Sequence, residues 1–328
     1  MEKIFVVGGA GYIGSHVVCC LLDHNFEITV FDNLSTGSIN NIFEGVKFIQ
    51  GDILDYPVLF KALGDDAYDG VIHLAGLKAA GESMDKPDAY AHQNISGTIN
   101  LLNAMSNSGT RDIVFSSSAA VYGSPQYLPL DEKHPTQPEN FYGFTKLVIE
   151  DLLHWYEKLK GLRYVSLRYF NAAGYDLNHR VTEVEKIANN LLPRVMEAAV
   201  GLREEIEIYG NDYDTEDGSC IRDYIHVTDL ARAHLLSLQH LWKTNQSIRI
   251  NLGSEKGFSV IHILERAREL TGKPIPSRVV GRRKGDPAVV IASSNLAGEI
   301  LGWEAVHSDT DTLIKSMWQV YEKKFSNA

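Results

Sequence analysis

The chain has 328 residues, of which 44% are hydrophobic, and its 42 acidic residues outnumber its 31 basic ones to give a net charge of −11. This size allows a large core in one domain or in two closely packed ones. The negative charge argues against nucleic acid as the main partner, because a surface that follows phosphates needs an excess of cations. Binding of an anionic ligand would depend on local lysines and arginines.

The cysteines and the apolar runs indicate a cellular compartment. Cys19, Cys20 and Cys220 give an odd total without Cys-x-x-Cys spacing, so we expect reduced, buried thiols and neither a disulfide framework nor a metal site. No apolar run of the sequence approaches the ~18 residues of a membrane span, and the run near the N-terminus is too short for a secretion signal. We therefore expect a soluble cytoplasmic protein with no membrane partner.

Short apolar runs alternate with amphipathic segments along the first two-thirds of the chain. Buried strands are predicted at 4–8, 27–32, 71–76, 112–118 and 164–170. Near-continuous apolar strands separated by helices are typical of a parallel sheet with helices on both faces. The pattern predicts an α/β fold with a doubly wound parallel sheet.

A glycine-rich segment joins the first predicted strand to a helix. Its sequence GGAGYIG places Gly8, Gly11 and Gly14 at Gly-x-x-Gly-x-x-Gly spacing, and Gly9-x-Gly11-x-x-Gly14 also fits. Glycines permit a tight turn and a close approach of the backbone to a pyrophosphate, which the N–H groups and dipole of the helix N-terminus stabilise. The alternative is a tight turn without a ligand. The context favours a Rossmann-like dinucleotide site.

Asp32 ends the second predicted strand, eighteen residues after Gly14. A carboxylate there can accept hydrogen bonds from both ribose hydroxyls of an adenosine and would repel a 2′-phosphate. The following segment, NLSTG, has no basic residue to neutralise a phosphate, so the sequence predicts NAD rather than NADP. Asp52 ends another strand and could face the adenine or solvent. Lys78 and Asn94 follow later strands and could be structural or functional.

The chain becomes less regular after Phe170. Strands are predicted at 205–210 and 248–254, and helices at 228–241, at 259–270 and near 311–323. No flexible linker divides the chain. We predict an NAD-binding domain over residues 1–170, to which some later segments return, and a smaller α/β substrate-binding region over residues 171–328, with a cleft between them.

A serine triplet, a tyrosine and a lysine supply candidate acid–base chemistry. The segment FSSSAAVYG lies where a parallel strand should end, and ligands of open α/β sheets bind outside such ends. Tyr142 and Lys146 are four residues apart, so they share a helix face, and the ammonium would favour the phenolate and lower the pKa of the tyrosine. Such pairs also arise by chance. With a serine they can activate a substrate hydroxyl.

Gly-x-x-Gly-x-x-Gly, serine and Tyr-x-x-x-Lys in this order resemble the extended short-chain dehydrogenase/reductases. Longer strings resemble the UDP-glucose 4-epimerases over essentially the whole chain: GGAGYIGSH, FDNLSTG, HLAGLKAAGES, SSSAAVYG, LRYFNAAG, GNDYDTEDGSCIRDYIHV and RRKGDPA. The resemblance implies interconversion of UDP-glucose and UDP-galactose through a 4-keto sugar with tightly bound NAD, as part of galactose metabolism. It also implies a homodimer paired through the helices after Asn94 and Phe141.

The resemblance also assigns residues. Tyr142 would be the base, Lys146 its electrostatic partner and a ligand of the nicotinamide ribose, and Ser118 the hydrogen-bonding partner of the sugar oxygen. The NAD site would include the glycines with Tyr12, Ile13, Asp32, Asn33, Asp52, Ile53, Lys78, Asn94 and Tyr169. The UDP-sugar would be held by Asn171, Asn190, Tyr209, Arg222, Arg283 and Asp286. Planar guanidinium groups suit a pyrophosphate.

The sequence departs from the family pattern at two places. The segment YDLNHRVTEVEKIANNLLP lacks the Gly-Glu and Gly-Ile-Pro elements that often precede Asn-Asn-Leu, so the conformation of this loop is not predicted. Val290 falls at the position that gates the 2-substituent of the sugar, where the family has either tyrosine or a small residue. Acceptance of UDP-N-acetyl sugars therefore stays open.

Three alternatives remain at this point. A UDP-N-acetylglucosamine or UDP-glucuronate 4-epimerase would differ only in the shape of its pocket. A nucleotide-sugar dehydratase needs extra acid–base groups after the strand-end serine, where this chain has Ala119 and Ala120. A non-catalytic NAD-binding protein would keep the fold without using Ser118, Tyr142 and Lys146.

Overall fold

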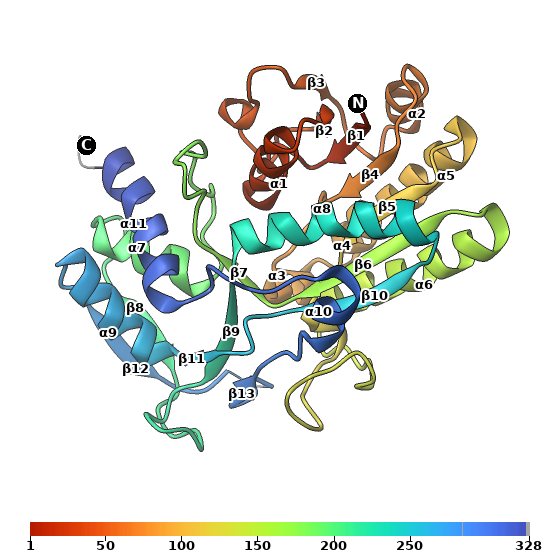
Figure 1. Cartoon of the computed structure of the whole chain (residues 1–328). Coiled ribbons are helices and arrows are strands. Elements are labelled where there is room, and N and C mark those ends of the chain that lie inside the picture. Colours follow the sequence, from red (N-terminus) through yellow and green to blue (C-terminus); the bar gives the residue numbers. More distant parts are fainter. Residues whose placement is uncertain (284, 326–328) are drawn as a thin grey trace.

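The structure is a computed structural model that describes residues 1–283 and 285–325. A parallel sheet of seven strands, in the order β10-β6-β5-β4-β1-β2-β3, forms the frame of one half of the molecule (Figure 1). Its strands are β1 (Lys3–Val7), β2 (Glu27–Asp32), β3 (Lys47–Gln50), β4 (Gly70–His73), β5 (Asp112–Ser116), β6 (Arg163–Tyr169) and β10 (Ile248–Leu252).

Helices cover both faces of this sheet. One core contains side chains of α1 (Tyr12–Asp23), α8 (Val227–Thr244) and α10 (Asn295–Leu301). The other contains side chains of α2 (Tyr56–Gly64), α5 (Gly97–Ser108) and α6 (Phe141–Lys160). Successive residues of β1 alternate between the two cores, as the pleat requires. The predicted doubly wound α/β fold is confirmed.

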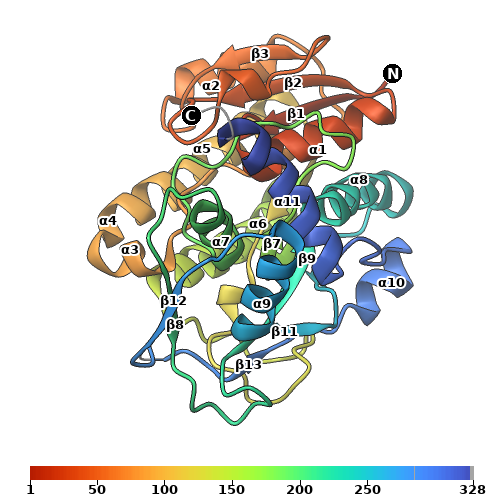
Figure 2. The same ribbon diagram turned by 90° about the vertical axis from the view of Figure 1, so that its left-hand side faces the viewer.

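Smaller sheets lie beside the large one, at the bottom of Figure 2. In one of them β9 (Ile221–His226) pairs with β7 (Asn171–Ala173), β11 (Gly257–Ser259) and β13 (Val289–Val290). In the other β8 (Ile206–Tyr209) pairs with β12 (Ser277–Val280). The helices α7 (Leu191–Ala199), α9 (Val260–Thr271) and α11 (Thr310–Phe325) pack around a third core.

Short helical segments connect these parts of the chain. They are α3 (Ala80–Asp85), α4 (Pro87–Tyr90), a π-helical stretch at Ala91–Ser96, and 3₁₀ turns at Ile39–Asn41 and Ala119–Val121. Helix α8 and strand β10 return from the second half of the sequence to the first core and sheet. The division at residue 170 stays a prediction about domains.

Three predicted strands end two or three residues earlier than expected, and one of these, β10, predicted at 248–254, stops at Leu252. Strand β4 stops at His73 and strand β5 at Ser116, because the chain turns toward the ligand edge of the sheet there. After β4, Gly76 has a φ of 149°. After β5, the hydroxyl of Ser118 accepts a hydrogen bond from the Ala120 N–H at 3.1 Å and caps a 3₁₀ turn. Predicted strand residues thus become ligand-facing loops.

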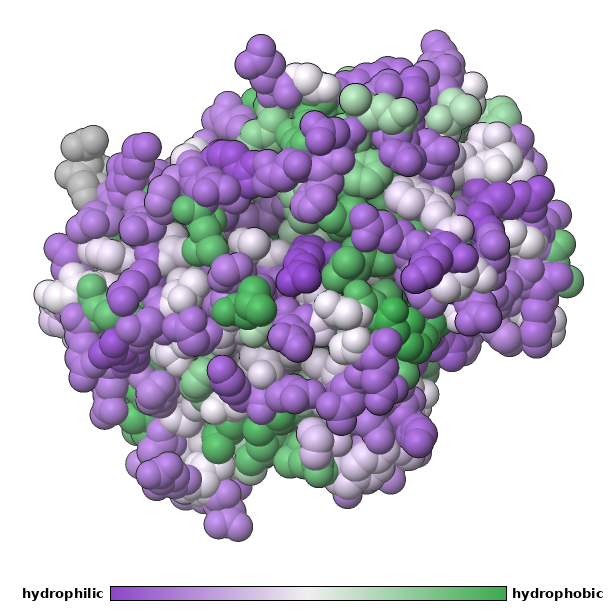
Figure 3. Space-filling view, in the orientation of Figure 1, coloured by the Kyte–Doolittle hydropathy of each residue, from purple (hydrophilic) through white to green (hydrophobic). Residues whose placement is uncertain are grey.

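The surface agrees with the composition. The face in Figure 3 is mostly hydrophilic, with hydrophobic residues in small groups between the polar ones. Cys19 and Cys220 are buried and Cys20 is partly buried, and all three are free thiols, as predicted for reduced cysteines. Within residues 1–283 and 285–325, the structure contains no helix that is both long and apolar enough to span a membrane.

Candidate active site

The glycine-rich turn brings the start of α1 close to the ends of two strands. Gly8 has a φ of 82°, and a Cβ atom there would lie 2.6 Å from the Ala75 nitrogen. At Gly14 a Cβ atom would lie 2.1 Å from the Gly8 carbonyl oxygen, so only glycine allows the helix to cross the turn this closely. Gly11 caps α1 without a side-chain hydrogen bond, which leaves N–H groups of Tyr12 and Ile13 for an anion.

Two carboxylates lie next to this turn. Asp32 accepts hydrogen bonds from the N–H groups of Ala10 and Leu34 at 3.0 and 2.8 Å, one on each oxygen, and keeps further lone pairs for ribose hydroxyls. Burial raises the pKa of Asp32, although both N–H groups favour the ionised form. Burial acts in the same direction on Asp52. Hydrogen bonds from the Leu54 N–H and from the Asn33 side chain favour the carboxylate more strongly, so the pKa of Asp52 is lowered.

Asn94 and Lys78 have different surroundings. The Asn94 amide exchanges hydrogen bonds with the backbone of Leu77 and donates to the Thr145 hydroxyl at 3.1 Å, which ties the loop after β4 to α6. Lys78 is half exposed, and its ammonium forms an ion pair with Glu185. Asn94 is therefore structural in part, and Lys78 already has an anionic partner.

Sequence reasoning missed a cation near the ribose side of the site. Lys186 belongs to the loop with the unusual sequence, and its ammonium donates to the carbonyl oxygens of Leu34 and Ser35 at 3.1 and 3.4 Å. It also lowers the pKa of Asp32, against the effect of burial. No local signal links Lys186 to Asp32, because 154 positions separate them in the sequence.

Ser118, Tyr142 and Lys146 meet at the carboxyl end of β5. Asn140 caps α6 by accepting a hydrogen bond from the Gly143 N–H at 2.8 Å, which places Tyr142 in the first turn and Lys146 one turn later. The Lys146 ammonium donates to the Ser116 carbonyl at 2.8 Å and lies 4.7 Å from the centre of the Phe115 ring. The predicted grouping of serine, tyrosine and lysine is present.

The pKa values of this group depend on burial. Burial lowers the pKa of Lys146 to about 8, and the charge of Glu150 opposes this shift. Burial raises the pKa of Tyr142, and the Ser118 hydroxyl opposes that shift. For the protein alone this direction is opposite to the sequence prediction, because burial disfavours the charged phenolate and the Lys146 ammonium bonds to a carbonyl instead of the phenol.

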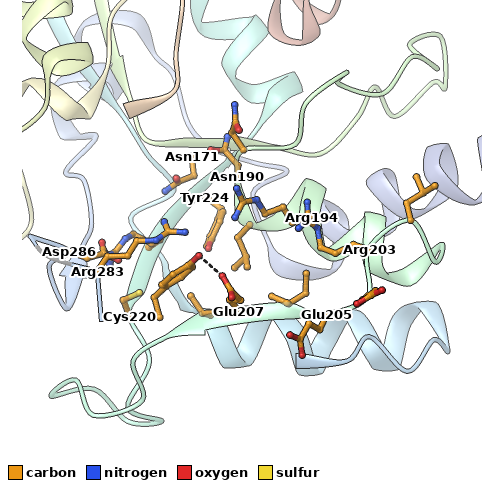
Figure 4. Close-up of a pocket in the computed structure, with 18 residues that line it drawn as sticks. Asn171, Asn190, Arg194, Arg203, Glu205, Glu207, Cys220, Tyr224, Arg283 and Asp286 are labelled. Atoms are coloured by element: carbon orange, nitrogen blue, oxygen red, sulfur yellow. Dashed lines mark hydrogen bonds and ion pairs between the residues drawn. The ribbon is translucent and has the colours of Figure 1, made fainter. Parts of the chain in front are cut away.

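A cavity of about 640 Å³ lies between β9, α7 and the strand β8 (Figure 4). Its walls include all six residues predicted to hold UDP: Asn171, Asn190, Tyr209, Arg222, Arg283 and Asp286. These residues come from five separate stretches of the chain. The structure therefore brings the predicted UDP residues into one cavity, which opens beside the end of β6.

Several side chains of the cavity contact one another. Arg222 forms an ion pair with Asp286, and the Arg283 guanidinium lies 3.6 Å from the centre of the Tyr209 ring. The Tyr209 hydroxyl donates to Glu207 at 2.7 Å, which is the dashed contact in Figure 4. A planar base and a pyrophosphate are the ligand parts that an aromatic ring with two guanidinium groups suits best.

The cavity contains residues that the sequence did not single out. Arg194 and Arg203 face Arg283 and Asp286 from the opposite side in Figure 4. Glu207 and Cys220 also line the wall. Arg194 follows Asn190 by one helical turn, so the spacing alone could have predicted that the two side chains lie on the same side of the helix.

Four further predicted residues also lie outside this cavity's wall. Val290 packs beside Ala119 and against the buried residues Val121, Tyr122 and Leu130, next to the turn that carries Ser118. Tyr169 ends β6, and burial raises its pKa. Tyr12 turns its side chain inward, with its hydroxyl on the Gly174 carbonyl, and Ile53 packs over Gly97.

Comparisons with known proteins agree with this geometry. Residues 4–253 match the NAD dependent epimerase/dehydratase family. The chain is 47% identical to a UDP-glucose 4-epimerase of Halalkalibacterium halodurans, covering 98% of this chain and 96% of that protein. It is 43% identical to a Brucella ovis UDP-glucose 4-epimerase solved with NAD, with a TM-score of 0.95 and coverage of 98% of each chain.

A Bifidobacterium longum UDP-glucose 4-epimerase solved with NAD⁺ and UDP is also similar, at 36% identity and a TM-score of 0.92, with 99% of each chain covered. Both solved relatives superpose over nearly their full length, including the region of the cavity. The chain therefore belongs to the NAD dependent epimerase/dehydratase family, and within it to the UDP-glucose 4-epimerases.

Proposed function

We propose that this protein interconverts UDP-glucose and UDP-galactose by inverting C4 of the sugar, with NAD as a bound cofactor. One observation carries the proposal. Tyr169 lies near Tyr142 of the predicted acid–base group, and two residues later Asn171 lines the cavity that contains Arg222 and Arg283, so this short segment joins the two sites. A relative of the same fold binds NAD⁺ and UDP.

The residues at the first site fit NAD. The turn at Gly8 and Gly14 has no space for a Cβ atom, α1 begins with unbonded N–H groups, and Asp32 retains acceptor capacity. These groups would hold the pyrophosphate and the adenosine ribose. When bound, NAD supplies a reversible acceptor for the hydride of C4.

The side chains of the protein move the proton. Tyr142 takes the proton of the 4-hydroxyl as the sugar is oxidised, and returns it when the 4-keto sugar is reduced. Ser118 donates a hydrogen bond to the sugar oxygen. Lys146 favours the phenolate by its charge, which counteracts the burial of the ring.

Inversion requires the sugar to present its two faces in turn. Charge-assisted hydrogen bonds from Arg222 and Arg283 would concentrate the binding energy on the pyrophosphate, away from the reacting carbon. The 4-keto sugar can then rotate about its link to UDP while the nucleotide stays bound. Asp286 and Tyr209 would contact the ribose and the base of UDP.

A turnover experiment tests this proposal. The purified, NAD-loaded protein is given UDP-galactose without added NAD, and the products are separated by chromatography. We expect UDP-glucose to accumulate to an equilibrium mixture, with no net reduction of NAD. Folded and NAD-loaded protein that leaves UDP-galactose unchanged would overturn the proposal.

A second substrate class is favoured by Val290. Its side chain is smaller than the tyrosine that closes the sugar pocket in some relatives, so we propose that UDP-N-acetylglucosamine is also accepted. A panel of UDP-glucose, UDP-N-acetylglucosamine and UDP-glucuronate distinguishes the alternatives. Val290→Tyr should abolish turnover of the N-acetyl sugar and spare that of UDP-galactose. Equal loss for both sugars would contradict the role of this position.

We also propose a homodimer that functions in the cytoplasm. Phe144, Val148, Leu152, Trp155 and Leu159 follow one another at three- or four-residue spacing along α6. The side chains of Phe144, Trp155 and Leu159 are 44%, 56% and 71% exposed. An apolar stripe of this kind suits a second copy of the same helix. Three free thiols suit a reducing compartment.

A further inference from the structure

A buried carboxylate lies directly behind the acid–base group. Glu150 follows Lys146 by one turn of α6 and Tyr142 by two, and its side chain is 0% exposed. A buried carboxylate is costly unless it is paired and hydrogen-bonded, so the partners of Glu150 define what it holds in place.

The partners of Glu150 include the strand that carries the serines. The Ser117 hydroxyl donates to one oxygen of Glu150 at 2.6 Å. Ser117 stands between Ser116, whose carbonyl accepts from Lys146, and Ser118. Helix α6 therefore holds two successive residues at the end of β5, Ser116 through Lys146 and Ser117 through Glu150, and Ser118 follows them directly.

A second set of bonds fixes Glu150 from β6. Arg168 donates to both oxygens of Glu150, at 2.9 and 2.5 Å, and a third N–H group of Arg168 donates to the Tyr122 hydroxyl at 3.0 Å. Tyr122 in turn donates to Asn251 of β10 at 2.6 Å. Burial disfavours the charge of Arg168, but the bonds to Glu150 outweigh it and raise its pKa. The Arg168 guanidinium therefore stays ionised beside the Glu150 side chain.

Glu150 is also the anion nearest to Lys146 among the titratable groups that face it. On α6 the ammonium has Tyr142 and Glu150 as neighbours. From β4 it faces His73, which burial holds neutral with a pKa of about 3. Tyr169 of β6 faces Tyr142, and burial raises its pKa, so it is neutral as well.

We propose that Glu150 is a positioning residue for the epimerase reaction: it fixes the serine strand end to α6 and keeps Lys146 protonated. The inference rests on the proposed function. Loss of its charge would remove the anion that favours the Lys146 ammonium and would leave the cations of Arg168 and Arg249 in this cluster, so Lys146 would lose its proton at lower pH. The residue would then set the upper pH limit of activity.

The test uses Glu150→Gln in the NAD-loaded enzyme. Glutamine keeps the shape and can still accept from Ser117, but it has no charge. We expect kcat to fall about tenfold or more through misplacement of Ser118 and Lys146. The alkaline limb of kcat against pH should move down by about one pH unit. The KM for UDP-galactose should change little, because the UDP cavity is elsewhere.

A matched control exists on the same two strands. Asp112 of β5 is buried and accepts two hydrogen bonds from Arg163 of β6, at 2.5 and 2.7 Å, at the opposite end of these strands from the serines. Asp112→Asn removes the charge of a carboxylate that is likewise buried and bonded twice by an arginine, although Arg163 is partly exposed. We expect it to destabilise the protein and to leave the pH profile unchanged. If kcat depended on pH in Glu150→Gln as it does in the wild type and in Asp112→Asn, the proposal would be overturned.

A second variant covers the case in which Glu150→Gln does not fold. Glu150→Gln combined with Arg168→Gln removes one negative and one positive charge from the buried cluster, where Arg249 also lies 3.4 Å from Glu150, so the net charge near Lys146 stays as in the wild type and the alkaline limb should lie closer to its wild-type position than in the single variant. If the alkaline limb of the double variant were displaced as far as is predicted for Glu150→Gln alone, the proposed effect of the Glu150 charge on Lys146 would be overturned.

The chain has 15 tyrosines, so the tyrosinate absorbance of NAD-loaded protein minus that of its Tyr142→Phe counterpart reports the Tyr142–Lys146 group without turnover. A displaced titration in Glu150→Gln supports the inference even if the wild type proves inactive on UDP-galactose, which separates this proposal from the failure of the proposed function. An unchanged titration would overturn it.

Discussion

The ammonium of Lys146 lies 5.8 Å from the centre of the Tyr142 ring, while it donates a hydrogen bond to the Ser116 carbonyl. Lys146 therefore acts on the tyrosine as a fixed nearby charge and not as a direct hydrogen-bond donor to the phenol. Since burial raises the pKa of Tyr142, this charge and that of oxidised NAD must supply the shift toward the phenolate.

Removal of the Tyr142 hydroxyl should abolish most of the activity. Tyr142→Phe leaves no group at this position to exchange a proton with the 4-hydroxyl, so we expect kcat to fall by about 100- to 10,000-fold. The variant should still bind NAD and UDP. Initial rates with UDP-galactose, together with the NAD content of the purified protein, measure both effects.

Tyr156 provides the control on the same helix. Its hydroxyl donates to Asn103 at 2.8 Å, far along α6 from the end of β5. Tyr156→Phe should retain activity close to that of the wild type. A Tyr142→Phe enzyme that matches Tyr156→Phe would show that another group transfers the proton.

The buried ammonium of Lys146 should make stability depend on pH. Its pKa is about 8 in the folded protein, against 10.5 ordinarily, so the unfolded chain binds this proton more tightly. The wild type therefore gains stability between pH 8 and 10.5, whereas Lys146→Met has no proton to lose there. Between pH 8 and 10.5, the free energy of unfolding of the wild type should therefore rise by about 3 kcal/mol relative to that of Lys146→Met.

Denaturant unfolding of both NAD-loaded proteins at several pH values measures this difference. Subtraction removes the titration of every group that the two proteins share. A difference that stays constant above pH 8 would mean that burial does not disfavour the ammonium.

The sequence predicted the parts of the site that depend on local spacing. Gly8, Gly11 and Gly14 had to form a tight turn before α1, and Asp32 had to end the next strand, because strand and helix periodicity fix both positions. Tyr142 and Lys146 share a face of α6 for the same reason. The position of each of these residues therefore depends on only one or two secondary-structure elements.

Contacts between distant segments could not be predicted in this way. Lys186 reaches the carbonyls after Asp32 from a loop whose sequence departs from the family, and Lys78 pairs with Glu185 of the same loop. The direction of the Tyr142 pKa shift was wrong for the protein alone, because spacing gives the lysine but not the burial of the ring. Burial is a property of the whole fold.

The affinity for UDP should depend on Arg283 and not on its neighbour Arg282. Arg283 lines the cavity and lies over the Tyr209 ring, whereas Arg282 pairs with Asp212 and lies over Tyr213. Arg283→Met should weaken binding of UDP by about 10- to 150-fold, the loss expected for a charge-assisted hydrogen bond.

The inhibition constants of UDP and of UMP as competitive inhibitors measure this affinity. UMP lacks the pyrophosphate, so its inhibition should change less in Arg283→Met than that of UDP. Arg282→Met should leave both inhibition constants near their wild-type values. Equal effects of the two substitutions would contradict the assignment of Arg283 to the pyrophosphate.

The exposed stripe of α6 should hold two copies of the chain together. Replacing both Trp155 and Leu159 with Glu places two like charges in a face that would otherwise be buried between helices, and an unpaired buried charge is costly. We expect the double variant to sediment as a monomer, with a lower melting temperature than the wild type. Analytical ultracentrifugation over a range of concentrations measures the change.

Val306 is 54% exposed and lies outside α6, so Val306→Glu is the matched control. It adds one charge at an exposed apolar position and should leave the mass of the particle unchanged. A wild-type chain that sediments as a monomer at all concentrations would contradict the dimer. A dimer that survives both substitutions on α6 would place the interface elsewhere, because the two charges would then remain in water and cost little.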